Sequence, residues 1–197
     1  MKTVVAFDFD GTLTRRDTLF LFLRHVAGSS LRYYFKMFLA LPVMMAYALR
    51  LLSNHEAKRH LISRFLKGMH RSELEKSCDA FADVIDKNLR QEAMSVLNRH
   101  KEHGDELIIV SASLRCWIEP WAKRNGFAHV IATELKYSEQ DVVAGEFSTP
   151  NCHGEEKVRR LREYLTPRDQ YRLIAYGDSR ADLPMLHFSD ESHYRDL

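Results

Sequence analysis

The stretch AFDFDGTLTRRD, residues 6–17, begins inside the apolar run TVVAF (residues 3–7) and places two aspartates one residue apart. The β-branched and aromatic residues of that run predict a buried strand that ends at Asp8. Carboxylates as close as those of Asp8 and Asp10 repel each other, and burying either one without a partner costs free energy. We therefore expect a positively charged group between them.

The composition is that of an ordinary globular protein, with 197 residues, of which 45% are hydrophobic and 28% are charged. This length fits one domain, or one domain that carries a smaller inserted unit. The three cysteines form no C-x-x-C pair, which argues against a disulfide framework or a structural zinc site and favours the reducing cytoplasm. Charged residues interrupt the N-terminus after about five apolar positions, so we expect no signal peptide.

Positive charge concentrates in residues 15–71, which hold eleven Lys or Arg and only two acids, Asp17 and Glu56. The formal net charge of the whole chain is +2, so the remainder of the chain is acidic overall. A split of this kind favours an anionic partner for the basic part, although a solvated basic face would give the same pattern. We do not expect that partner to be a nucleic acid.

The apolar pattern divides the chain into two kinds of segment. Residues 18–94 are helical throughout, with apolar positions at spacings of three and four, as in Leu61 and Phe65. Later in the chain, helical segments alternate with buried strands at residues 106–112, 129–132 and 171–178. Residues 133–148 are either a strand pair or an irregular excursion. Strands that alternate with helices favour a parallel sheet. We predict a doubly wound, Rossmann-like α/β core of residues 1–17 and 95–197, with an inserted helical cap of residues 18–94.

Three polar residues, Asp8, Ser111 and Asp178, stand where predicted strands stop. Ligands of open parallel sheets bind at the carboxyl ends of the strands, so we expect one edge to gather these residues. Several aspartates together make a hard, oxygen-rich site that suits Mg²⁺. The metal would offset the repulsion between the carboxylates, so that one of them can attack phosphorus. A serine and a lysine would bind the phosphate oxygens, and Lys157 is a candidate for that lysine. The pattern therefore predicts phosphoryl transfer.

Four short motifs follow one another along the chain: DFDGT (8–12), IIVSAS (108–113), NCHGEEK (151–157) and YGDSRADLPML (176–186). In this order they resemble the four motifs of the haloacid dehalogenase-like hydrolases. The chain is most similar to the phosphoserine-phosphatase-like branch, whose helical cap is inserted after the first strand. The resemblance covers residues 1–17 and 95–187, and four motifs in order are far more specific than any one of them.

The resemblance implies roles for three aspartates. Asp8 would be the nucleophile that forms an aspartyl-phosphate. Asp10 would protonate the leaving oxygen and then deprotonate the attacking water, a proton carrier that a dehalogenase does not need. Asp178, together with Asp8 and the backbone carbonyl of Asp10, would bind Mg²⁺. A simpler interpretation of these aspartates is that they form turns by hydrogen bonding to their own backbone.

The resemblance also implies a phosphate-binding set. Ser111, the backbone of Ala112, and Lys157 would bind the phosphate, and Asp182 would orient a metal-bound water or the lysine. Each of these has a structural alternative as well. Ser111 or Ser113 could cap the following helix, Lys157 could be a solvated helix residue, and Asp182 could be a cap before Pro184.

Two features bear on the substrate. Gly11 and Asp17 stand where the phosphoserine branch has a serine and a substrate-binding glutamate, and Ala181 replaces a common asparagine, so the match to a phosphoserine pocket is imperfect. The run MFLALPVMMAYAL, residues 37–49, carries no charge. It is shorter than the roughly twenty residues of a simple membrane span. It is therefore either buried among cap helices or interfacial, as in the similar stretch of bacterial phosphatidylglycerophosphatases.

We predict a Mg²⁺-dependent phosphatase for phosphate monoesters, with a lipid-linked substrate such as phosphatidylglycerophosphate. One alternative is a soluble small-molecule phosphatase of the phosphoserine type, and a more remote one is a non-catalytic, membrane-associated scaffold. The basic residues Arg32, Lys36 and Arg50 flank the uncharged run, which predicts that the cap docks on anionic membrane surfaces. Such a protein would be cytoplasmic and peripheral at the inner face of the membrane.

Overall fold

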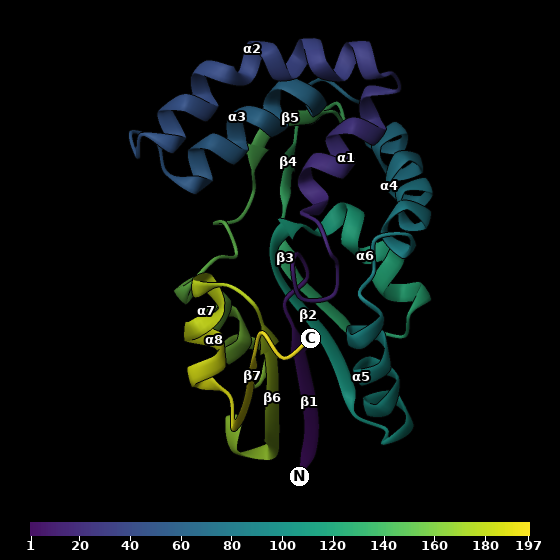
Figure 1. Cartoon of the computed structure of the whole chain (residues 1–197), viewed down its shortest axis with the longest axis vertical. Helices are drawn as coiled ribbons and strands as arrows, with labels where there is room; N and C mark the ends of the chain where they lie inside the picture. Colours follow the sequence, from purple (N-terminus) through teal and green to yellow (C-terminus); the bar gives the residue numbers. More distant parts are fainter.

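A five-stranded parallel sheet forms the centre of the computed structural model, which describes residues 1–197 (Figure 1). The strands lie in the order β3-β2-β1-β6-β7, and every neighbouring pair is parallel. Their bounds are Lys2–Phe7 for β1, Glu106–Leu114 for β2, His129–Thr133 for β3, Tyr171–Gly177 for β6 and Glu191–Tyr194 for β7. This arrangement confirms the predicted doubly wound α/β core.

The central strand β1 is buried on both faces. Val5 and Phe7 pack into one apolar cluster, while Val4 and Ala6 pack into another on the opposite side of the sheet. A parallel strand covered on both faces needs apolar residues at every position, which explains the continuous run in the sequence. The two faces are covered by helices on either side (Figure 1), with bounds Gln91–Glu102 for α5, Arg115–Arg124 for α6, Glu155–Tyr164 for α7 and Leu183–Phe188 for α8.

The predicted helical insertion between the first two strands is confirmed. After β1 the chain passes through α1 to α5 before it returns to the sheet as β2. The first four of these helices lie beyond the end of the sheet that is opposite to the N-terminus (Figure 1). Their bounds are Thr18–Ala27 for α1, Ser30–Ala48 for α2, Asn54–Leu66 for α3 and Arg71–Asp86 for α4. The predicted boundary at residue 94 lies inside α5.

The stretch of residues 133–148, which the sequence left open as a strand pair or an irregular excursion, is an antiparallel hairpin of β4 (Leu135–Tyr137) and β5 (Val143–Phe147). It leaves the main sheet and packs against α3 (Figure 1). Gly145 permits this contact, because a Cβ atom at that position would lie 2.7 Å from Oγ of Ser63 on α3. Its φ of +83° also falls in the region that favours glycine. The core therefore supports the helical cap through a second element.

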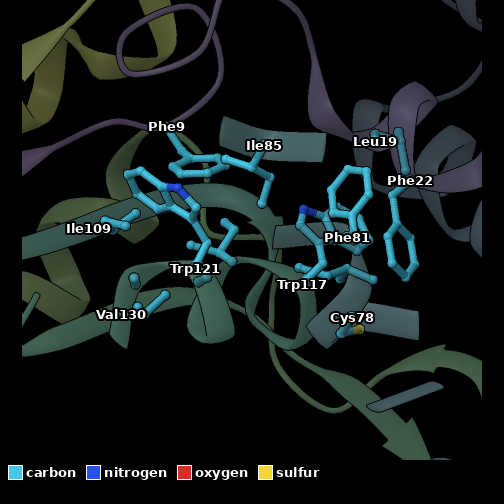
Figure 2. Packing of buried hydrophobic residues seen from close by; sticks show 14 of the residues in the cluster. Phe9, Leu19, Phe22, Cys78, Phe81, Ile85, Ile109, Trp117, Trp121 and Val130 are labelled. Atoms are coloured by element: carbon cyan, nitrogen blue, oxygen red, sulfur yellow. The ribbon is translucent and has the colours of Figure 1, made fainter. Parts of the chain in front are cut away.

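Aromatic side chains join the helical cap to the core (Figure 2). Phe22 of α1 stacks on Trp117 of α6 with ring centroids 4.6 Å apart, and it meets Phe81 of α4 edge to face at 5.0 Å. Phe9 packs edge to face on Trp121 of α6 at 5.5 Å. Such aromatic contacts bury large areas and add specific geometry. The position of α1 relative to the sheet is therefore fixed by packing.

Helix α2 differs from the other helices because, of its 19 residues, only Ala40 is buried. The apolar run of residues 37–49 is therefore not the core of the helical cap, one of the two interpretations that the sequence left open. None of the helices is both long enough and apolar enough to cross a membrane.

Two smaller features were not predicted. The strand before α6 continues past Ala112 to Leu114, where it still pairs with Thr133 of β3 after a register shift. The C-terminal tail adds the edge strand β7, which pairs with β6. The sequence of β7, ESHY, is polar because an edge strand buries little of its surface, and so it gave no apolar signal.

Candidate active site

The carboxyl ends of β1, β2 and β6 bring together the polar residues that follow or end these strands. Asp8 follows β1, is buried, and its backbone N–H donates to the carbonyl oxygen of Tyr176 on β6 at 2.9 Å. Ser111 lies near the end of β2, and Asp178 directly follows β6. Because β2, β1 and β6 are neighbours in the sheet, these three residues share one edge.

A buried lysine links two of the acids. Lys157 lies in the first turn of α7, is 2% exposed, and its ammonium donates to Oδ1 of Asp8 and to Oδ1 of Asp182, both at 2.6 Å. Burial acts to lower the pKa of Lys157, but the two carboxylates outweigh it and hold that pKa above its ordinary value. This ammonium lies between Asp8 and Asp182 and forms no ion pair with Asp10.

Asp10 has a separate set of partners at the start of the helical cap. Its Oδ1 accepts hydrogen bonds from the backbone N–H of Thr18 at 2.7 Å and from the Thr18 hydroxyl at 2.6 Å. Its Oδ2 accepts from the hydroxyl of Ser113 at the end of β2. The indole of Trp117 donates to the same Thr18 hydroxyl at 3.3 Å. The orientation of the Asp10 carboxylate therefore depends on how α1 packs on the core.

Asp182 combines the two roles that the sequence presented as alternatives. Its Oδ2 accepts from the backbone N–H of Ser179 at 3.0 Å and from the Ser179 hydroxyl at 2.6 Å, which caps the short helical turn before α8. Its Oδ1 accepts from Lys157. Burial acts to raise the pKa of Asp182, but the ammonium of Lys157 and the Ser179 hydrogen bonds hold it below its usual value. Asp182 thus stays ionised and fixes the position of the lysine.

The turn after β1 is shaped around Asp178. The hydroxyl of Thr12 donates to Asp178 at 3.3 Å and lies 3.4 Å from the Asp8 carboxylate. Gly11 has a φ of +89°, and a Cβ atom there would lie only 2.4 Å from Oδ2 of Asp178. Any side chain at position 11 would therefore displace the aspartate. This geometry accounts for the glycine at position 11.

The serines in the last part of β2, Ser111 and Ser113, do not cap the next helix. The residue at the N-cap position of α6 is Leu114, and no side chain accepts a hydrogen bond there. Instead, the buried hydroxyl of Ser111 accepts from the backbone N–H of Ser113 at 3.0 Å. The Ala112 carbonyl oxygen accepts from the Thr133 hydroxyl at 2.8 Å. Residues 111–113 are therefore held in place at the carboxyl end of β2, where the register with β3 shifts.

The charges at this edge do not balance. Asp8, Asp178 and Asp182 each offer a carboxylate oxygen within 4.8 Å of the others, and Lys157 is the one cation that bonds to them. Three carboxylates and one ammonium leave two negative charges uncompensated in a mostly buried site. Burial, followed by the neighbouring acids, raises the pKa of Asp8 to about 7 although Lys157 opposes this shift.

The donor set suits a divalent cation with hard oxygen ligands. The Asp10 backbone carbonyl accepts no hydrogen bond from the protein, and the carboxylate of Asp178 accepts from one other side chain, the Thr12 hydroxyl. Asp182 is less suitable as a direct ligand, because both of its oxygens already accept hydrogen bonds. Carboxylate and carbonyl oxygens are the ligands that Mg²⁺ prefers. The residues present therefore fit the predicted metal.

Lys58, which was not predicted from the sequence as a site residue, reaches the site from α3 in the helical cap. It is 7% exposed, and its ammonium donates to the Ala112 carbonyl and, at 3.4 Å, to Oδ1 of Asn151. Burial lowers the pKa of Lys58 to about 8, although the charges of Asp10 and Asp17 oppose the shift. The sequence did contain a signal for it. Lys58 falls on the same apolar face of the helix as Leu61 and Phe65, and a charged residue on such a face is unusual unless it has a specific role.

A cavity of about 610 Å³ lies between the core and the helical cap. Its floor contains Asp8, Asp10 and Lys157, and its wall includes Lys58. Helix α2 supplies an apolar part of the lining with Val43, Met44, Tyr47 and Ala48. The cavity therefore joins a charged floor to an apolar roof, and it is large enough for a substrate of moderate size.

Comparison with known proteins gives the class of the chain. The family model described as haloacid dehalogenase-like hydrolase matches residues 5–187. The chain therefore belongs to the haloacid dehalogenase-like hydrolases and is a phosphatase-like enzyme of this family, as the four motifs indicated.

Among its relatives, Protein CicA of Caulobacter vibrioides is 35% identical over 193 residues, which cover 98% of this chain and 85% of that protein. A crystal structure of a protein of unknown function from Bordetella pertussis Tohama I superposes with a TM-score of 0.83 at 23% identity, covering 98% of this chain and 89% of that one. A structure titled as a phospho-aspartyl intermediate analogue of phosphoserine phosphatase superposes with a TM-score of 0.67 at 18% identity, covering 97% and 85%. At these identities the two structural likenesses establish the shared fold alone.

Proposed function

We propose that this protein is a Mg²⁺-dependent phosphatase that hydrolyses phosphate monoesters through an aspartyl-phosphate on Asp8. The observation that carries the proposal is the buried Asp8–Lys157–Asp182 arrangement beside Asp178, with its two uncompensated negative charges. Residues 18–94 act in this proposal as a cap domain that covers the site of a core domain formed by the rest of the chain.

In the first step, Asp8 attacks phosphorus while the bond from phosphorus to the leaving oxygen breaks. Asp10 protonates that oxygen, so the product departs as an alcohol. In the second step, Asp10 takes a proton from water, which attacks phosphorus and releases inorganic phosphate from Asp8. The hydrogen bonds from Thr18 and Ser113 keep Asp10 in place for both proton transfers.

The phosphate is bound by groups that are already fixed before it arrives. Lys157 is held by Asp182 and neutralises charge that develops on the phosphate oxygens. Ser111 and the backbone N–H of Ala112 supply further donors at the end of β2. Asp8, Asp178 and the Asp10 carbonyl would hold Mg²⁺, which supplies charge neutralisation between the nucleophile and the phosphate dianion.

For the substrate we propose an amphiphilic or lipid-linked monoester, of which phosphatidylglycerophosphate is an example. The apolar lining from α2 supports this choice, since Val43, Met44 and Tyr47 could contact an apolar part of the leaving group. A soluble monoester of the phosphoserine type is the second candidate. Lys58 and Asp17 both line the cavity, and their opposite charges could bind a carboxylate and an ammonium.

The deciding experiment measures phosphate release in the presence of Mg²⁺ from three monoesters: phosphoserine, glycerol phosphate and phosphatidylglycerophosphate. Chelation with EDTA should abolish release and added Mg²⁺ should restore it, while Asp10→Asn should slow release roughly 100- to 10,000-fold. Full activity in EDTA would rule out the metal role. No release from any monoester, with Mg²⁺ bound, would favour the scaffold interpretation.

A further inference from the structure

The outer face of α2 is a continuous apolar stripe that no other part of the chain covers. Leu31, Phe38 and Met45 are 82%, 66% and 63% exposed. At about 100° per residue these positions lie within roughly 40° of one another on the helix, and Ala40, the buried residue, lies on the opposite side. Further exposed members of the stripe are Tyr34, Phe35, Leu41 and Leu49.

This distribution is inverted relative to an ordinary surface helix, which presents polar residues to solvent. The inner face of α2 packs on α3 and lines the cavity through Met44 and Tyr47, so the helix cannot turn its stripe inward without opening the site. Figure 1 shows α2 as the outermost element of the helical cap, across the end of the molecule away from the N-terminus. An apolar patch of this extent marks an interaction surface.

The part of the chain that carries the stripe is rich in positive charge. Residues 15–71 hold eleven Lys or Arg and two acids, an excess of nine positive charges, while the whole chain has a formal net charge of +2. Arg24, Arg32, Arg50, Arg64 and Lys67 are exposed and form no ion pair. An exposed apolar helix face with unpaired basic residues is complementary to a surface that has negative charge on the outside and an apolar interior below it.

We propose that α2 docks with its outer face on an anionic phospholipid bilayer, lying parallel to the membrane plane. The apolar stripe enters the boundary between headgroups and acyl chains, and Arg32 and Arg50 contact phosphate groups. A second copy of the chain fits less well, because pairing two such faces would bring two strongly basic surfaces together. Docking in this orientation places the roof of the cavity at the headgroup layer. The inference does not depend on the proposed catalytic function.

The test is flotation of the purified protein with lipid vesicles, which requires no activity. We expect the protein to float with vesicles of phosphatidylcholine and phosphatidylglycerol at about three to one, but to float much less with phosphatidylcholine alone. Raising the salt from about 0.1 M to about 1 M should reduce flotation, since surface charges are then screened. Flotation that is equal on both vesicle types at both salt concentrations would contradict the role of charge.

Two matched variants each introduce two glutamates, one variant on the stripe and the other on a different surface. Phe38→Glu with Met45→Glu should lower the vesicle partition coefficient about tenfold or more, because acids oppose insertion and headgroup contact. Ala80→Glu with Gln91→Glu, on exposed positions of α4 and α5, adds the same charge away from the stripe and should change partition less than about twofold. Unchanged circular dichroism and thermal unfolding would show that both variants are folded.

Three results would overturn the proposal. One is a wild-type protein that stays at the bottom of the gradient with every vesicle. Another is a Phe38→Glu, Met45→Glu protein that floats as well as wild type. The third is a dimer in sedimentation velocity that the same pair of substitutions converts to a monomer, without flotation of wild type, which would assign the stripe to a second copy.

Discussion

Two apolar segments of the chain, β1 and the middle of α2, have opposite surroundings. Val4 to Phe7 of β1 are fully buried between helices on both faces of the sheet, whereas most large side chains of α2 remain exposed. The apolar run is longer in α2 than in β1, so hydrophobicity alone does not decide burial. The position in the topology decides it, since β1 lies at the centre of the sheet and α2 at the outer edge of the helical cap.

The difference in burial corresponds to different roles for the end of β1 and the outer face of α2. The end of β1 holds a polar cluster in which nearly every group has a partner, as required where chemistry depends on fixed positions. The outer face of α2 makes no contacts within the chain, as required for a surface that binds a membrane or another molecule. Substitutions should therefore have large effects near β1, intermediate effects where the helical cap meets the core, and small effects on the α2 stripe.

The largest effect is expected at the end of β1. Asp8→Asn should lower the rate of phosphate release by about 10,000-fold or more, because the amide cannot act as the nucleophile. The exposed Asp79→Asn on α4 is the matched control and should retain the wild-type rate. An Asp8→Asn protein that releases phosphate at the wild-type rate would refute the aspartyl-phosphate mechanism.

The next effect concerns the contact between the helical cap and the core. Phe22→Ala should lower the free energy of unfolding by about 3–5 kcal/mol, since it leaves a cavity between Trp117 and Phe81. The measurement is urea denaturation followed by circular dichroism. A loss below about 1 kcal/mol would show that the aromatic contacts in Figure 2 contribute little to stability.

Lys58 should show a smaller effect with a defined pH dependence. Its pKa is about 8 in the folded chain and 10.5 ordinarily, so the unfolded chain binds more protons between these values and stability rises with pH across this range. Lys58→Met removes the cost of burying the charge and should raise the free energy of unfolding by about 1–3 kcal/mol at pH 7.

The gain from Lys58→Met should shrink as the pH rises above 8 and vanish near 10.5. The Ala112 carbonyl keeps the Thr133 hydroxyl as a donor in this variant. Urea denaturation at pH 7 and pH 10 measures the difference, and Lys76→Met, at an exposed position of α4, is the control. Destabilisation of Lys58→Met at pH 7 would show that the buried ammonium is a net stabilising group.

The smallest effect is expected on the α2 stripe. Phe38→Ala makes the same chemical change as Phe22→Ala, also in a helix of the cap, but at a side chain that is 66% exposed. The free energy of unfolding should change by less than about 0.5 kcal/mol, because little buried area is lost. A loss comparable to that of Phe22→Ala would mean that the α2 stripe is covered in solution, by a second copy or by another part of the chain.

Much of the fold followed from local patterns. The runs that became β1, β2, β3 and β6 are apolar enough to predict buried strands, and their alternation with helices predicted the parallel sheet. The edge strand β7 could not be predicted because its residues are mostly polar and it pairs with one strand only, β6. The hairpin β4–β5 was one of two alternatives that its sequence left open, and its contact with α3 was not predicted.

For the candidate site, residues next to strand ends were predictable and residues from distant segments were not. Asp8, Ser111 and Asp178 were found because parallel strands carry their carboxyl ends to one edge. Lys58 was missed because it is separated from Ala112 by 54 positions and joins the site only when α3 packs above it.

The sequence by itself determined the family, the sheet and the set of acids, because these depend on short motifs and on apolar runs whose period is local. Only the tertiary structure decided three things: the lysine beside Asp8 also pairs with Asp182, Asp10 is held by Thr18, and the outer face of α2 is uncovered. The physical reason is the same in each case. A hydrogen bond or a buried surface needs two partners, and here each pair of partners comes from different elements brought together by packing.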